Sequence, residues 1–394
     1  MTSIGLGPRW KCLMANDFSE KKARAYCANF SPASELILKD VHALSTKELP
    51  GRPVLAWASF PCQDLSLAGK GCGLKGHRSG SYWGFWRLLK ELENEGRPIP
   101  MIVLENVVGT ITAKHGNDFC ILLESLVELD YLIGPLVVDA VHFVPQSRPR
   151  LFIVAVKRDH FIAEGVLRDT PGLTWHPAKL RDAYKRQSSD VRKSWIWWNL
   201  ALPPKSQMKL DDIIEPDPKD VVWHIAVETQ RLLDLMSPLN RRKVQKAQAS
   251  GKRFVGTIYR RVRQDKFGNK AQRAEVRFDQ ISGCLRTGSG GSSRQFIMII
   301  EGDKIKSRLI SSREAASLMG LPASYILPKT YNETYHLLGD GLVVPVVSWL
   351  EKELLYPLAV GSERSSFDGA ALARVVGNVE PVQLTIEFRE RLHG

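Results

Sequence analysis

Four residues whose side chains could take part in covalent catalysis fall at the expected ends of strands. Cys62 and Glu105 each follow a short apolar run, and Arg148 and Arg150 precede a third. A thiolate is a strong nucleophile beside positive charge, a positioned carboxyl group can move protons, and guanidinium groups stabilise developing negative charge. In an open parallel sheet, ligands bind beyond the carboxyl ends of the strands. We therefore expect these side chains to converge on one edge of a sheet.

The elements that must position them lie between residues 10 and 157. Short apolar runs alternate with amphipathic stretches there, which predicts a βαβ sheet. The runs at 54–58 and 101–104 are apolar throughout, so both faces of these central strands should be covered. Only about ten residues join the last two strands, too few for a helical crossover. We expect that pair to be antiparallel, with the last strand starting at the edge where the parallel strands end. The expected strands are 11–15, 36–38, 54–58, 101–104, 136–141 and 151–156, and the expected helices are 20–29, 83–94 and 118–129.

The pattern changes in the middle of the chain. Residues 161–300 hold scattered Trp, Pro and basic residues with weak periodicity, which predicts an irregular second domain. The WIWW cluster at 195–198 favours packing over base stacking. Helical patterning resumes at 312–320 and 343–355. We expect residues 1–160 to form one domain and residues 301–394 to return and complete it.

The net charge of +13 is concentrated in one segment. Residues 241–310 contain 18 Lys or Arg against 5 Asp or Glu, so this segment carries the whole excess. A solvated basic face is one interpretation. Interleaved aromatic residues and a Gly/Ser loop at 288–293, beside Arg286 and Arg294, favour a phosphate-binding surface instead. That loop lacks the GK[ST] ending of a P-loop, which argues against nucleotide hydrolysis.

Five motifs in order resemble those of the cytosine-C5 DNA methyltransferases. They are PCQ at 61–63, ENV at 105–107, QSRPR at 146–150, SSREAA at 311–316 with MG at 319–320, and GDG at 339–341 with VPV at 344–346. The resemblance covers about 10–160 and 305–355. It implies the α/β class: a Rossmann-like, S-adenosylmethionine-dependent methyltransferase sheet with an antiparallel last strand, plus a target recognition domain.

The resemblance also implies a reaction, methyl transfer from S-adenosylmethionine to C5 of a flipped cytosine in duplex DNA. The Cys62 thiolate would add to C6 and make C5 nucleophilic. Glu105 would act at N3 and Arg148 near O2, with Arg150 in support. The base must leave the duplex stack, and the loop after Cys62 would close on the DNA. The implied DNA contacts are Gln63, Ser66, Gln146, Arg260, Arg261, Arg263, Arg286 and Arg294, and the implied cofactor contacts are Asn16, Asp17, Asp40, Phe60, Asp340 and Gly341.

Each of these residues taken alone has a plainer interpretation. A cysteine after a strand is more often a packed core thiol, and Glu105 alone would be a helix N-terminal acid. Asp17 and Asp40 are turn or capping residues about as often as ligands. The combination of Cys62 with the Glu and Arg motifs downstream favours catalysis.

The chain departs from the family pattern at its start. The family opens with a strand and a glycine-rich turn that hold the methionine end of the cofactor, whereas residues 1–8 resemble the helix that follows the turn. We therefore expect a gap between the strands ending at Ala15 and Ala58, with unpaired backbone groups. A start site placed too late explains this best; a split or truncated gene and a pseudo-enzyme are the alternatives.

Composition narrows the remaining possibilities. No membrane span or signal peptide is visible, which predicts a cytoplasmic protein. The six cysteines form no CxxC pair, so we expect neither disulfides nor a metal site. A zinc deaminase would need HxE and PCxxC motifs, which the chain lacks. A tRNA cytosine methyltransferase and a DNA-binding protein without catalysis remain as rivals. The expected partners are duplex DNA and a cognate restriction endonuclease, with the chain itself a monomer.

Overall fold

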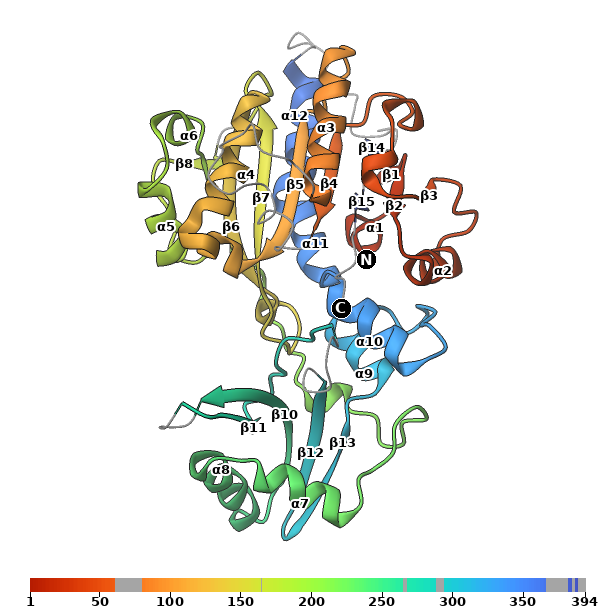
Figure 1. Cartoon of the computed structure of the whole chain (residues 1–394), viewed down its shortest axis with the longest axis vertical. Helices are drawn as coiled ribbons and strands as arrows, with labels where there is room; N and C mark the ends of the chain where they lie inside the picture. The colour runs from red at the N-terminus through yellow and green to blue at the C-terminus, as the bar shows by residue number, and fades with distance from the viewer. Residues whose placement is uncertain are drawn as a thin grey trace.

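Two sheets of different build organise the chain (Figure 1). In this computed structural model the described residues are 1–60, 80–163, 165–264, 268–287, 294–365, 382–384 and 387–388. The larger sheet mixes parallel and antiparallel strands, and the smaller, antiparallel sheet lies below it in Figure 1. No helix among these residues is long and apolar enough to cross a membrane.

The first part of the chain forms most of the larger sheet, as predicted. β4 and β5 run parallel, and β7 lies antiparallel between β5 and β6. The antiparallel last strand is thus confirmed. β3 and α2 have the predicted bounds. The single strand predicted at 11–15 is instead two short strands, β1 and β2, and the other predicted elements are shifted or extended by a few residues. The elements are α1 (Thr2–Leu6), β1 (Trp10–Cys12), β2 (Ala15–Asp17), α2 (Glu20–Asn29), β3 (Leu36–Leu38), β4 (Leu55–Ser59), α3 (Ser81–Asn94), β5 (Met101–Val107), α4 (Asn117–Glu128), β6 (Tyr131–Asp139) and β7 (Pro149–Lys157).

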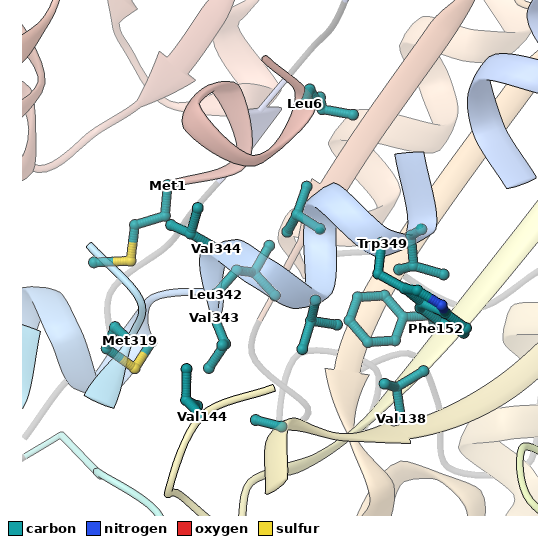
Figure 2. Close-up of a cluster of buried hydrophobic side chains, with 14 of the residues drawn as sticks. Met1, Leu6, Val138, Val144, Phe152, Met319, Leu342, Val343, Val344 and Trp349 are labelled. Carbon is teal, nitrogen blue, oxygen red and sulfur yellow. The ribbon is translucent and has the colours of Figure 1, made fainter. Parts of the chain in front are cut away.

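Both faces of the central strands are buried, which explains their continuous apolar sequence. Leu55 and Trp57 of β4 face one hydrophobic core, whereas Ala56 and Ala58 face a second. α3 and α4 cover the second core, while α1 and α11 (Val344–Leu350) close the first. Figure 2 shows part of the first core, where Met1 and Leu6 from the start of the chain meet side chains of the return segment such as Val344 and Trp349. The start of the chain and the return segment therefore belong to one domain.

The predicted gap between β2 and β4 is filled by the end of the chain. β14 (Val382–Leu384) pairs in parallel with β1, and β15 (Glu387–Phe388) pairs in parallel with β4. β15 also lies beside β2, and β14 beside β4. The expectation of an open gap at this place is therefore corrected.

The middle of the chain is more regular than predicted. It holds a four-stranded antiparallel sheet in the order β11, β10, β12, β13, with α7 and α8 packed on one face over a core of its own. Long strands were missed because arginines interrupt the apolar alternation. The elements are α7 (Ala226–Asp234), α8 (Pro238–Ala249), β10 (Arg253–Gln264), β11 (Lys270–Arg277), β12 (Gln295–Glu301) and β13 (Lys304–Leu309).

Residues 165–200 pack on the larger sheet rather than with this second domain. They form β8 (Leu167–Arg168), α5 (Ala178–Lys185), α6 (Ser189–Lys193) and β9 (Trp197–Trp198). Trp195 and Trp197 join the core under α4, and the Trp198 Nε1 donates to the carbonyl of Gly134 at 2.9 Å. The packing role of the WIWW cluster is confirmed. Residues 165–200 thus lie with the larger sheet, and β13 lies with the smaller one, while the domain limits at 160 and 300 stay a prediction.

A buried ion pair joins β13 to the return segment. Arg308 and Glu314 are both 0% exposed, and Arg308 Nη2 lies 2.5 Å from the Glu314 carboxylate. Glu314 also completes a capping box with Ser311 at the start of α9 (Ser312–Leu318). The SSREAA motif is thus the entry to the return segment, which continues through α10 (Tyr331–Asp340), not predicted, then α11 and α12 (Tyr356–Ser365).

Candidate active site

The carboxyl end of β5 carries the central ion pair of the candidate active site. Glu105 lies near the carboxyl end of β5, and its carboxylate is 3.2 Å from Nε of Arg150. Arg150 is the second residue of antiparallel β7. Both side chains are at most 15% exposed. A carboxylate held by a guanidinium at a strand edge can exchange a proton with a ligand while the arginine compensates its charge.

Arg148 lies deeper than Arg150 and is tied to the backbone of distant segments. It is 2% exposed and donates to the carbonyls of Leu285 at 2.6 Å, Gly339 at 2.7 Å and Gly341 at 2.8 Å. Burial lowers the pKa of Arg148 to about 10, so it stays charged at neutral pH. These bonds engage both terminal nitrogens of the guanidinium, whereas its buried Nε has no hydrogen-bond partner among the described residues. Arg150, not Arg148, is thus the arginine that pairs with Glu105, and the catalytic role expected of Arg148 stays a prediction.

Asn106 of the ENV motif links β5 to the segment that leads into the predicted nucleophile. Its Nδ2 donates to the Phe60 carbonyl at 2.9 Å, and its Oδ1 accepts from Val107 N at 2.8 Å and from Thr110 Oγ1 at 3.0 Å. Phe60 is buried against Tyr82. The backbone that enters the Cys62 loop is thus fixed to the strand bearing Glu105, a role that sequence reasoning did not assign to Asn106.

The loop predicted to bear the nucleophile lies outside the described residues, and with it Cys62, Gln63 and Ser66. Gln146 is described and is 0% exposed. Its side chain donates to the Leu318 carbonyl at 2.7 Å and accepts from Leu285 N at 3.0 Å. These bonds engage the Gln146 amide within the protein, and its DNA contact stays a prediction.

A second thiol lies at this site that sequence reasoning missed. Cys284 Sγ is 3.3 Å from Nη1 of Arg148 and 3.8 Å from Nη2 of Arg150. Burial raises the pKa of the Cys284 thiol, but the two arginines outweigh it, and the net pKa is lowered. No motif marked this residue, since its neighbours come from the other domain.

The predicted cofactor residues gather around the carboxyl end of β2. Asn16 and Asp17 line a small cavity together with Lys22, Tyr26 and apolar side chains. Asp17 accepts from Ser19 N at 2.8 Å, and Asn16 donates to the carbonyls of Ile37 and Lys39. A buried carboxylate beside aromatic and apolar walls is a donor set that fits a nucleoside.

The other predicted cofactor residues flank this cavity or cap a turn. Asp340 pairs with Lys22 of the cavity wall at 2.7 Å, and a Cβ at Gly341 would lie 2.2 Å from the Met1 sulfur. Asp40 is exposed and caps the turn after β3 by accepting from His42 N at 2.8 Å. The structure thus shows the capping role of Asp40, which was the alternative to cofactor binding.

The predicted DNA-contacting arginines of β10 are divided between the two faces of the smaller sheet. The cross-strand register pairs Arg261 with Arg273 and Arg263 with Ala271 on the face without helices. Glu275 lies on that face, 2.6 Å from Arg263 and 4.0 Å from Arg261. Arg260 points to the opposite face, with its guanidinium 5.1 Å from the centre of the Phe296 ring.

Arg286 and Arg294 flank the loop at 288–293, which lies outside the described residues. Arg286 is exposed, and Arg294 donates to Asn332 Oδ1 at 2.5 Å. The backbone at Arg286 approaches α10 so closely that a Cβ at Gly339 would lie 2.6 Å from Thr287 N. This contact explains one glycine of the GDG motif.

Comparison with known proteins gives one consistent result. The family described as C-5 cytosine-specific DNA methylase matches residues 2–355. The type II methyltransferase M.MspI of Moraxella sp is 24% identical over 356 residues, covering 90% of this chain and 68% of that protein. M1.ScrFI of Lactococcus lactis subsp. cremoris is 22% identical over 346 residues, covering 88% and 72%. The crystal structure of S. pombe Dnmt2 methyltransferase shares the fold, with a TM-score of 0.53, 17% identity, and coverage of 88% and 91%.

Proposed function

Because this chain belongs to the C-5 cytosine-specific DNA methylase family, as its motifs predicted, we propose that it methylates cytosine in duplex DNA through a covalent bond from Cys62. S-adenosylmethionine supplies the methyl group. The Glu105–Arg150 pair at the edge where the Cys62 loop begins carries this proposal. An unperturbed thiol is only a few per cent ionised near neutral pH, so arginines at this edge favour the thiolate.

Glu105 and Arg150 act on different atoms of the cytosine ring. Addition of the Cys62 thiolate to C6 pushes electrons toward N3 and O2 of the ring. Glu105 protonates or hydrogen-bonds N3. Arg150, 3.2 Å from Glu105, contacts O2 in place of Arg148, for which the resemblance implied that role. Arg148 acts as a positioning residue, because it joins β7 to both Leu285 and the GDG turn.

Asn16 and Asp17, with Asp340 and Gly341 nearby, are the residues that would hold the cofactor. The Asp17 carboxylate suits ribose hydroxyl groups, and the apolar wall of the cavity suits a flat ring. Phe60 directly follows β4, which is separated from β2 by β15. It would close the cofactor site on the side of β4.

The test of this function is methyl transfer from labelled S-adenosylmethionine to three substrates: duplex DNA, the same DNA as single strands, and tRNA. We expect the label in duplex DNA, recovered as 5-methylcytosine after digestion to nucleosides. Label in tRNA alone would establish the RNA-directed rival. Tight binding of duplex without any transfer would establish a DNA-binding protein that lacks catalysis.

The helix-free face of β10 and β11 is the proposed phosphate-binding surface. Since Arg261 and Arg263 share that face and Arg260 does not, we revise the expected contribution of β10 from three phosphate contacts to two. The double change Arg261→Gln with Arg263→Gln should flatten the slope of log K against log salt by up to about two units, at about 0.9 per phosphate.

The salt dependence has two matched controls. Arg260→Gln should leave the slope nearly unchanged. Glu275→Gln removes the acid that pairs with Arg261 and Arg263, and should strengthen binding to every duplex alike. Titrations of each variant with duplex DNA at four salt concentrations measure both the affinity and the salt slope. If Arg260→Gln changed the salt slope more than the double change of Arg261 and Arg263, the DNA would bind the opposite face of the sheet.

Duplex DNA is then the chain's main partner, contacted by a monomer in the cytoplasm. The type II names of its relatives suggest a cognate restriction endonuclease that cuts the unmethylated sequence.

A further inference from the structure

A cavity on the smaller domain lies outside the candidate active site. It has a volume of about 380 Å³ and lies where α8 packs against the end of β11 and the start of β10. In Figure 1 these elements lie below the larger sheet, away from β5 and β7, which carry the Glu105–Arg150 pair. Sites for small molecules have volumes of about 300–1,000 Å³, so the cavity is large enough for one. Its walls are Lys243, Lys246, Ala247, Phe254, Arg277, Phe278 and Asp279.

Two aromatic rings form the apolar part of this cavity. Phe254 of β10 and Phe278, just after β11, meet edge to face with their ring centres 5.9 Å apart. A Cβ at Gly256 would lie 2.5 Å from the Phe278 ring, so this ring packs directly on the backbone of β10. Both phenylalanine side chains are only half-buried, although they are apolar. Rings that are fixed in place and still accessible can stack against a flat ligand.

Two lysines supply positive charge at the cavity. Lys243 and Lys246 lie one turn apart on α8, and Lys243 Nζ donates to the carbonyl of Val276 at 3.2 Å. Neither lysine has an ion pair with any residue that the structure describes. The acid of the wall, Asp279, accepts from Arg277 Nε at 2.8 Å and from its Nη2 at 2.6 Å, which compensates the acid's charge. Three cations and one carboxylate leave the cavity with a net charge of +2.

The sequence around the cavity favours an anion as its ligand. Residues 235–264 contain nine Lys or Arg and no Asp or Glu. Arg261 and Arg263 lie on the helix-free face, where the phosphate-binding surface is proposed, whereas α8 packs on the opposite face. The positive charge of α8 is therefore not explained by that surface.

We propose that this cavity binds a nucleoside phosphate, with the base on the two aromatic rings and the phosphate at the two lysines. The ammonium groups attract a phosphate as point charges, and the rings offer a surface on which any base can stack. Inorganic phosphate would leave the apolar part of the cavity unused. The ligand is a free nucleotide or a nucleotide at an unpaired strand end of DNA. This inference does not depend on the proposed methyl transfer, which takes place at another site.

Binding of thymidine 5′-monophosphate to the full chain tests this site, with S-adenosylmethionine present at saturation so that the cofactor cavity is occupied. The nucleotide should bind at least about tenfold more tightly than thymidine or inorganic phosphate, because each of these fills only part of the site. Protection from hydrogen exchange should appear at amides 254–256 and 276–279 and not at 101–107. Equal affinity for all three compounds, or protection at 101–107 alone, would overturn the proposal.

Variants of the cavity wall test each half of the ligand. Lys243→Gln with Lys246→Gln should weaken the binding of thymidine 5′-monophosphate at least about tenfold. Phe278→Leu keeps an apolar side chain against Gly256 but removes the ring, and should weaken binding at least about fivefold. Arg242→Gln is the matched control, because Arg242 is exposed on α8 and does not line the cavity. A loss from Arg242→Gln equal to that from the two lysines would mean unspecific attraction to a basic surface and would overturn the proposal.

Two duplexes of one sequence separate the two sources of the ligand, one blunt and one with a short unpaired stretch of thymidines at its 3′ end. If the ligand is a strand end, the overhang should strengthen DNA binding at least about threefold, and the change of Lys243 and Lys246 should remove that gain. If the ligand is a free nucleotide, the overhang should have no effect, while thymidine 5′-monophosphate still binds. Methyl transfer to the blunt duplex tests the proposed function separately, so the failure of one can be told from the failure of the other.

Discussion

Replacing Cys62 by alanine is expected to abolish methyl transfer while duplex affinity stays within about twofold. The thiol makes the covalent bond to C6, whereas phosphate contacts come from another part of the chain. Without that bond, C5 of cytosine is a poor nucleophile toward a methyl sulfonium. Single-turnover transfer of labelled methyl groups, with binding measured in parallel, separates the two quantities.

Cys27→Ala is the matched control for Cys62→Ala. Cys27 is an exposed free thiol on α2, away from the Glu105–Arg150 pair, and its loss should leave the rate unchanged. Measurable turnover by Cys62→Ala would contradict the covalent mechanism.

Glu105→Gln is expected to lower the chemical rate by a factor of about 10² or more with little effect on binding. The amide keeps the shape of the carboxyl group but cannot deliver a proton to N3. It also leaves Arg150 without the carboxylate that lies 3.2 Å from it. Rapid-quench single-turnover rates at saturating DNA measure the chemical step alone.

Two further variants test whether the effect of Glu105→Gln comes from the Glu105–Arg150 pair. Glu91→Gln, on the exposed face of α3 in a pair with Arg87, should leave the rate unchanged. Arg150→Lys should lower the rate, because an ammonium cannot reproduce the guanidinium fork. A Glu105→Gln enzyme limited only in DNA affinity would make the carboxylate a structural element.

The first half of the fold could be predicted because its signals are local. The continuous apolar runs around Leu55 and Ile102 reflect strands buried on both faces, and the short link before β7 allows no parallel return. The same local signals exist at 382–388, where alternation is clear. That segment was not predicted, because nothing in its sequence says which strands it joins.

The residue types of the candidate site could be predicted from the sequence, but not which of these residues are buried. Arg148 and Arg150 belong to one motif, and only the return of Gly339 and Gly341 decides which of the two is buried. Gln146 is similar, since its partners come from beyond residue 280. The faces of Arg260 and Arg261 depend on a strand whose alternation is hidden by its charges.

Covalent attack by Cys62 is the central claim, and trapping tests it most directly. Duplex DNA with 5-fluorocytosine at the target position should stop the reaction after methyl transfer, because the C5 fluorine cannot leave as a proton does. The adduct requires the cofactor. We predict that mass spectrometry of the digested adduct places the nucleotide on the peptide that contains Cys62. A nucleotide on Cys284, the thiol that lies beside Arg148 and Arg150 among the described residues, or complete methylation without any adduct, would contradict the account.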